Sequence, residues 1–166
     1  MVVVYVDTNV IIARYKPNDP LYKVADKFFQ KNYDFVVSPV TLVELYSVLA
    51  RIKPFLRFSK GLESVNLDTL IAFIIYDLKL KLVARSFMSS FQIFGERFRI
   101  PLEYHLAMRF AEKLRLKTLD ALHIVYAYIL RDSLDYIVTG DDDILSAREM
   151  IKQYIGLEIR NPSELL

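Results

Sequence analysis

Five carboxylates stand beside apolar runs, where an isolated charge is unfavourable. They are Asp7 after residues 1–6, Glu44 within residues 40–49, Asp120 before residues 121–130, and Asp141 and Asp143 after residues 136–140. A charge next to buried apolar surface is costly unless it has a partner. If these groups meet in space, their mutual repulsion makes a bound cation the natural partner. Ligands that are all oxygen atoms favour Mg²⁺ or Mn²⁺ over zinc or copper.

The elements that must position these acids alternate between strands and helices. Apolar runs predict strands at residues 2–6, 35–38, 136–139 and 157–160. Helical patterns and their start and stop signals predict helices at residues 21–30, 39–52, 67–86, 101–114, 118–131 (with Thr118 as N-cap) and 142–154. Residues 91–100 are ambiguous and can hold a short strand. The alternation predicts an α/β fold with a parallel sheet and helices on both faces, in a single domain of residues 1–166.

This topology predicts where the acids lie. In such folds the carboxyl ends of strands and the amino ends of helices share one edge of the sheet. Asp7 and Asp141 follow strands directly, whereas Glu44, Asp120 and Asp143 lie in the first turns of helices. All five therefore fall on the carboxyl edge, where open α/β sheets place their active sites.

Each acid also has a purely structural explanation. Asp7 can cap a helix, Asp120 can stabilise a helix dipole, and at least one residue of the run 141–143 is expected to be a cap. Glu44 is harder to explain in this way, because apolar and small residues flank it on its own helix face: Val40, Val43, Ser47 and Val48.

Short polar residues and histidines accompany the acids. Thr8, Asn9 and Thr139 are either turn-formers or ligands of a substrate phosphate or of a metal's water molecules. His105 and His123 lie in different predicted helices without a zinc-binding spacing, so core or half-exposed histidines are the better interpretation.

Composition limits the class of protein. The chain is 54% hydrophobic with a mean hydropathy of +0.24, which indicates a large core and an apolar surface for a partner. No uncharged apolar stretch approaches the roughly 20 residues of a membrane span, and no signal peptide is recognisable. The absence of cysteine excludes disulfides and thiol chemistry and fits a cytoplasmic protein.

The net charge of +2 is unevenly distributed. Residues 51–117 contain 13 Lys and Arg against 6 Asp and Glu, so the five acids lie in the acidic remainder. An acidic centre in a basic frame suits metal-dependent chemistry on a polyanion, although solvated helix faces explain the charges equally. The helix-like spacing of Phe87, Phe91, Phe94 and Phe98 favours a core or a protein interface over stacking on bases.

Four short motifs carry a resemblance to a known family. They are VYVDTNVI at 4–11, PVTLVEL at 39–45, TLDALHI at 118–124 and IVTGDDDIL at 137–145. In this order they resemble PIN-domain ribonucleases, especially the VapC-type toxins of prokaryotic toxin–antitoxin pairs. The chain departs from a compact PIN domain in residues 53–100, a segment that is longer and more apolar than such toxins usually need.

The resemblance implies a three-layer α/β/α sandwich and a Mg²⁺- or Mn²⁺-dependent endoribonuclease. It implies catalytic roles for Asp7, Glu44, Asp120 and Asp141. The metal ligands that it implies are Asp7, Asp120, Asp141 and Asp143. A homodimer and an inhibitory antitoxin are the partners that it implies. The RNA phosphates are expected to contact Arg51, Lys53, Arg57, Arg97 and Arg99.

Three other functions are alternatives to the nuclease. A phosphatase of the haloacid-dehalogenase type needs a second Asp where Asn9 stands. A flavodoxin-like receiver domain needs a Lys after a late strand, and none follows residues 136–139 or 157–160. A PIN-like subunit that only binds RNA or protein has no need of the acid cluster.

Overall fold

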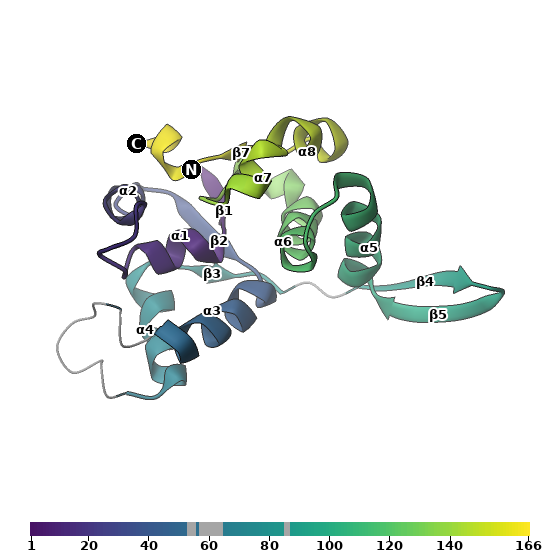
Figure 1. Ribbon diagram of the computed structural model, residues 1–166, viewed down its shortest axis with the longest axis horizontal. Coiled ribbons are helices and arrows are strands. Elements are labelled where there is room, and N and C mark those ends of the chain that lie inside the picture. Colours follow the sequence, from purple (N-terminus) through teal and green to yellow (C-terminus); the bar gives the residue numbers. More distant parts are fainter. Residues whose placement is uncertain (53–55, 57–64, 85–86) are drawn as a thin grey trace.

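The computed structural model describes residues 1–52, 56, 65–84 and 87–166. Its centre is a sheet of five strands in which every neighbouring pair is parallel (Figure 1). In spatial order the strands are β3 (Lys81–Leu82), β2 (Asp34–Val37), β1 (Val3–Val6), β6 (Tyr136–Val138) and β7 (Glu158–Arg160). The predicted parallel sheet is therefore confirmed, with β3 as a strand that the sequence pattern did not predict.

Helices cover both faces of this sheet and complete the predicted three-layer sandwich. One face carries α1 (Thr8–Ala13), α2 (Tyr22–Phe28), α3 (Pro39–Ile52) and α4 (Leu67–Asp77). The other carries α5 (Leu102–Leu114), α6 (Thr118–Ile129), α7 (Asp142–Ser146) and α8 (Arg148–Ile155). Two short 3₁₀ helices are η2 (Arg131–Ser133) and η3 (Pro162–Leu165).

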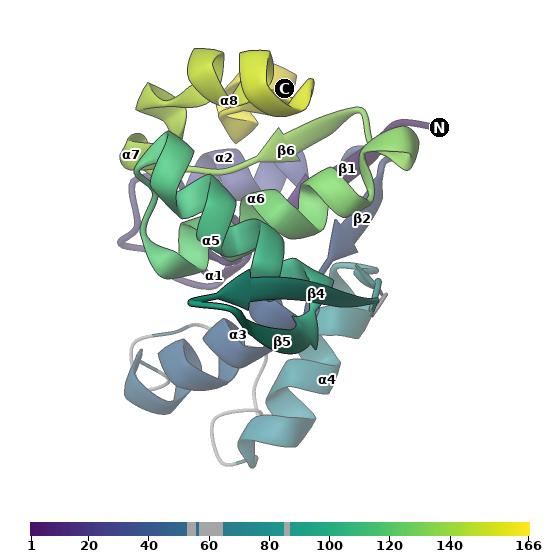
Figure 2. The same cartoon turned by 90° about the vertical axis from the view of Figure 1, so that its right-hand side faces the viewer.

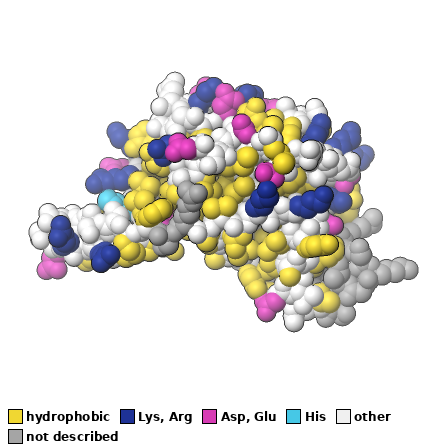
Figure 3. Space-filling view, turned by 180° about the vertical axis from the view of Figure 1, so that it is seen from behind, with side chains coloured by type: hydrophobic (Ala, Val, Ile, Leu, Met, Phe, Trp, Pro, Cys, Tyr) yellow, Lys and Arg dark blue, Asp and Glu magenta, His cyan; other side chains and the backbone are white. Residues whose placement is uncertain are grey.

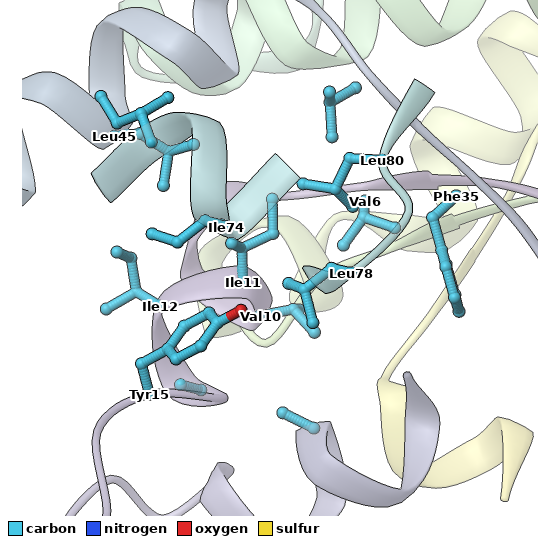
Figure 4. Packing of buried hydrophobic residues seen from close by; sticks show 14 of the residues in the cluster. Val6, Val10, Ile11, Ile12, Tyr15, Phe35, Leu45, Ile74, Leu78 and Leu80 are labelled. Carbon is cyan, nitrogen blue, oxygen red and sulfur yellow. The ribbon is translucent and has the colours of Figure 1, made fainter. Parts of the chain in front are cut away.

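Strand β1 shows why this sheet needs two helical layers. Its side chains alternate between the faces, so Val4 and Val6 join one core while Tyr5 joins the other. In the first core, Val6 packs with Ile11 of α1 and Ile74 of α4 (Figure 4). A strand that is buried on both faces explains the continuous valine run at the amino terminus.

The predicted helix 67–86 is wrong for residues 78–84, and its last two residues lie outside the described part of the chain. Helix α4 ends at Asp77, and Lys79 adopts a left-handed conformation with φ 52°, which turns the chain into β3. The two residues of β3 pair with β2, and Lys81 forms an ion pair with Asp34. Apolar periodicity alone did not distinguish this short edge strand from a helix continuation.

The ambiguous segment 91–100 forms most of an antiparallel hairpin. Strands β4 (Met88–Ile93) and β5 (Glu96–Pro101) pair along their full length and project from the body (Figures 1 and 2). The helix-like spacing of the phenylalanines was misleading, because the turn at Phe94 and Gly95 makes Phe91 and Phe98 cross-strand neighbours.

Two smaller predictions about helices also need correction. Lys117, not Thr118, occupies the N-cap position of α6. The predicted helix 142–154 is two helices, α7 and α8, with Ala147 between them. Among the described residues, no helix is long and apolar enough to cross a membrane.

Candidate active site

Four of the predicted acids line one pocket at the carboxyl edge of the sheet. Asp7 follows β1, Glu44 lies on α3, Asp120 begins α6 and Asp141 follows β6. The pocket has a volume of about 310 Å³. Its other lining residues are Thr8, Asn9, Ile12, Lys16, Asp19, Val48, Ile52 and His123. The sheet topology therefore brings together acids that are far apart in the sequence.

Asp7 is buried, and its carboxylate is held in one orientation. It occupies the N-cap position of α1 but makes no capping hydrogen bond. Instead its Oδ2 atom accepts hydrogen bonds from Asn9 Nδ2 at 2.9 Å and from Thr139 Oγ1 at 2.6 Å. The structural role of a helix cap thus does not account for Asp7.

Glu44 lies at the end of a buried chain of hydrogen bonds. Its Oε2 atom accepts a bond from Thr8 Oγ1 at 2.5 Å and lies 2.6 Å from His123 Nε2. The other ring nitrogen, Nδ1, lies 2.8 Å from the hydroxyl of Tyr5, which also bonds Ser38. The contacts fix both the histidine ring and one carboxylate oxygen, while Glu44 Oε1 has no partner among the described residues.

Asp120 and Asp141 complete the pocket in different ways. Asp120 makes no hydrogen bond or ion pair with any residue that the structure describes. Asp141 caps α7, because its Oδ1 atom accepts the backbone N–H groups of Asp143 and Ile144. Its backbone N–H donates to Thr139 Oγ1, so Thr139 joins Asp141 to Asp7.

Asp143 does not line the pocket of the four acids but lines a neighbouring hollow together with Asp141. Its Oδ2 atom is 2.5 Å from Lys117 Nζ, and this exposed ion pair raises the pKa of the lysine. A second lysine, Lys16, lines the acidic pocket and pairs with Asp19 at 3.2 Å. The rim of the site therefore carries positive charge beside the carboxylates.

The concentrated negative charge changes the acidity of the site. Burial raises the pKa of Asp7, and the charge of Glu44 adds to this shift. Partial burial, with the charges of Asp141 and Asp7, raises the pKa of Asp120. These shifts show that ionised carboxylates here lack sufficient compensation from the protein.

The pair of Glu44 and His123 is the exception. Burial is the largest effect and disfavours both charges, but their hydrogen bond and the neighbouring charges together outweigh it, so the pKa of His123 is raised and that of Glu44 is lowered. The charge of Asp7 also contributes to the histidine shift. Both partners therefore favour their charged forms in the fold.

The donor set fits a divalent cation. One ligand atom each of Asp7, Glu44 and His123 lies within 4.8 Å of the others. Asp120 adds a carboxylate without a partner among the described residues, and Asp141 keeps Oδ2 free of the capping bonds. Carboxylate oxygens in this number, with raised pKa values at two of them, suit a hard cation such as Mg²⁺ or Mn²⁺.

The small polar residues hold the acids. Thr8 donates to Glu44, and both Asn9 and Thr139 donate to Asp7. The Asn9 side chain also accepts the backbone N–H of Gly140, which joins α1 to the loop after β6. Because Thr139 is fully buried, its hydroxyl acts on Asp7 and not on a ligand in the pocket.

The basic residues that are predicted to bind RNA phosphates lie in different parts of the chain. Arg51 is exposed at the end of α3, and Arg97 and Arg99 lie on the projecting strand β5. Lys53 and Arg57 lie outside the described residues.

Sequence reasoning missed the buried chain of Tyr5, Ser38 and His123. His123 is a buried histidine, as expected, but its partners are the acids of the site. Two spacings in the sequence could have indicated that Tyr5 and His123 belong to the site. Tyr5 lies two residues before Asp7 on one strand, and His123 lies three residues after Asp120 on one helix, so each shares the face of its acid.

Comparisons with known proteins agree with this geometry. No curated protein matches the sequence. A chain in the crystal structure of VapBC2 from Rickettsia felis, bound to a DNA fragment from their promoter, superposes with a TM-score of 0.53 at 13% identity. The match covers 96% of this chain and 98% of that one, and it shows a common fold. The PIN domain family matches residues 4–149, which include all the acids of the site. This chain belongs to the PIN domain family.

Proposed function

We propose that this protein is a metal-dependent endoribonuclease and the toxin of a toxin–antitoxin pair. The observation that carries the proposal is the meeting of Asp7, Glu44, Asp120 and Asp141 in one pocket. Membership of the PIN family and the fold shared with a VapBC2 chain support the nuclease and the antitoxin partner. A homodimer and a cytoplasmic location belong to the same proposal. We also infer that residues 1–166 form a single domain, because one sheet contains strands from both ends of the chain.

Asp7, Asp120 and Asp141 would hold Mg²⁺ or Mn²⁺, with Asp143 in support. When bound, the ion offsets the negative charge that builds up on the phosphodiester in the transition state. Hydrogen bonds orient two of these carboxylates before an ion binds. Asn9 and Thr139 fix one oxygen of Asp7, and the cap of α7 fixes one oxygen of Asp141.

Glu44 would orient the attacking water and accept its proton. His123 and Thr8 hold Oε2, so Oε1 is the oxygen left for the water. The lowered pKa of Glu44, which the hydrogen bond from His123 causes against the effect of burial, keeps the base ionised at neutral pH. The water oxygen adds to phosphorus as the P–O3′ bond breaks. The leaving 3′-oxygen takes a proton from solvent, so the products are a 5′-phosphate and a 3′-hydroxyl.

The test is cleavage of labelled RNA by the wild type, Asp7→Asn and Asp141→Asn, in Mg²⁺, in Mn²⁺ and in EDTA. Asn is a good N-cap residue, so the second variant keeps the cap of α7. Asp142→Asn is the matched control, since it changes an exposed neighbour outside the acidic pocket. We expect cleavage only by the wild type and the control, and only with metal. Cleavage by either site variant, or in EDTA, would overturn the mechanism.

A further inference from the structure

The β4–β5 hairpin, residues 88–101, is a two-stranded arm that stands apart from the central sheet. It projects from the body beside α5 in Figure 1, lies in front of the body in Figure 2, and forms one end of the molecule in the space-filling view of Figure 3. A two-stranded hairpin is marginally stable in water unless it packs against further structure. No residue of this arm lines the acidic pocket, so its exposed apolar surface calls for another explanation.

One face of the arm and helix α5 form a groove that is lined by both apolar and charged side chains. Phe91 stacks on its cross-strand neighbour Phe98 at 5.6 Å, and its ring lies 5.2 Å from the ring of His105 on α5. The groove has a volume of about 280 Å³. It is lined by Phe91, Gln92, Ile93, His105, Met108, Arg109 and Glu112.

The tip of the arm carries an aromatic side chain in an unfavourable conformation. The turn is formed by Phe94 with φ 50° and Gly95 with φ 84°. Asn or Gly is preferred at the first of these positions, because a bulky side chain is unfavourable in a left-handed backbone conformation. The Phe94 side chain is fully exposed, so it gains no packing in return. Local structure does not explain Phe94, which points to contact with another molecule.

The charges near the tip and beside the groove are complementary. Glu96 and Arg97 flank the tip and form no ion pair within the described part of the chain. Arg109 and Glu112 line the groove and form only a long contact with each other, at 4.0 Å between exposed side chains. A second copy of the tip in this groove can therefore place Glu96 near Arg109.

The apolar area is sufficient for a dimer. Phe94 is fully exposed, and between 43% and 54% of each of Ile93, Phe98, Tyr104 and Met108 is exposed. At about 200 Å² for each large side chain, they offer roughly 600 Å² of apolar surface. Homodimer interfaces are about 65% apolar, so this corresponds to an interface of roughly 900 Å² on each chain. A stable complex needs about 800 Å² from each partner.

We propose that the arm joins two copies of this chain, with Phe94 of each copy inserted into the groove between β4 and α5 of the other. The projecting aromatic residue and the groove belong to the same chain, so a two-fold axis satisfies both at once. Glu96 then pairs with the partner's Arg109. The inference rests on the homodimer in the proposed function and is independent of the nuclease activity.

The first test is sedimentation of the full chain over a range of concentrations. Phe94→Asn suits the left-handed turn and removes the aromatic side chain, so it should preserve or raise the stability of the monomer. Loss of a central aromatic contact should weaken the dimer at least about 30-fold. Tyr76→Asn is the matched control, because Tyr76 is a highly exposed aromatic residue on α4 outside the arm. It should leave the dimer unchanged.

The second test is a charge exchange. Glu96→Lys and Arg109→Glu should each weaken the dimer, and the double variant should restore it. A wild type that is monomeric at about 100 µM would contradict both the homodimer and the arm. A dimer that persists in Phe94→Asn, or a double variant without rescue, would contradict the arm alone.

The same variants also test whether the arm binds a different ligand. If they leave the oligomeric state unchanged and instead lose binding of RNA or of an antitoxin peptide, the arm serves that ligand and the proposal fails. Sedimentation needs no catalysis, so a dimer that forms through the arm but cleaves no RNA would contradict the nuclease and support the arm.

Discussion

The Nε2 atom of His123 lies 2.6 Å from the Oε2 atom of Glu44, at the end of a chain of hydrogen bonds that begins at Ser38 and passes through Tyr5. This contact joins α6 to α3 across the carboxyl edge of the sheet. It ties the position of a proposed catalytic acid to the buried core, and it makes the stability of the protein dependent on pH.

Stability should fall above neutral pH by loss of the His123 charge. The pKa of His123 is raised in the fold, so its contribution is complete below its ordinary value of 6.5 and is lost as the pH rises through the folded value. The pKa of Glu44 is lowered, so its contribution is present above 4.5 and is lost on acidification. The pair thus stabilises most between about pH 4.5 and 6.5.

The measurement is urea unfolding of the wild type and His123→Gln in EDTA at several pH values. The difference in unfolding free energy should be greatest near pH 5 to 6, at about 1–3 kcal/mol for a buried charged hydrogen bond, and should shrink toward pH 9. A difference that stays constant across this range would show that the ionic form of the pair does not contribute.

Asp7→Asn should stabilise the metal-free protein while it abolishes RNA cleavage. Burial raises the pKa of Asp7, so its charge opposes folding at neutral pH. An asparagine oxygen can accept the same two hydrogen bonds, from Asn9 and Thr139, that Oδ2 accepts. Each kcal/mol gained would raise Tm by about 2–4 °C, which thermal unfolding in EDTA measures. A lower Tm would mean that the carboxylate has a structural role.

The sequence was sufficient to place the acids but not the groups that hold them. Valine runs and helix starts indicate a parallel sheet, and that topology alone places Asp7, Glu44, Asp120 and Asp141 at one edge. The bond between Glu44 and His123 depends on the relative rotation of α3 and α6, which periodicity does not determine. It is therefore visible only in the structure.

Residues 67–101 show a second limit of sequence patterns. Apolar residues at helical spacing continue past Asp77, where the chain instead forms β3. The turn at Phe94 lacks the Asn-Gly or Asp-Gly sequence that commonly marks a hairpin. Phe94 stands where such a turn usually has Asn or Asp, and the dimer proposal explains why a phenylalanine is found there.

Bound metal should stabilise the wild type and not a variant that lacks a ligand. Asp120→Asn removes a charge whose pKa is raised by burial and by Asp141 and Asp7, so the metal-free variant should unfold no earlier than the wild type. At a metal concentration of 100 times Kd, binding adds about 2.7 kcal/mol. Thermal unfolding with Mn²⁺ and with EDTA should therefore show a Tm shift for the wild type that Asp120→Asn lacks. Asp142→Asn should shift like the wild type, and an equal shift in Asp120→Asn would remove Asp120 from the ligand set.

Asp143 should support the metal without being essential to it. Its carboxylate pairs with Lys117 outside the pocket of the four acids, and exposed pairs of this kind contribute little to stability. Asp143→Asn should therefore leave Tm nearly unchanged. It should weaken Mn²⁺ binding by about 10- to 100-fold, as loss of a residue that supports the metal ligands does. Asp141→Asn, in contrast, should abolish Mn²⁺ binding. Calorimetric titration with Mn²⁺ distinguishes these results. Lys117→Met is the informative companion, because it frees the Asp143 carboxylate and should strengthen Mn²⁺ binding. Unchanged Mn²⁺ affinity in both variants would assign Asp143 to the exposed ion pair alone.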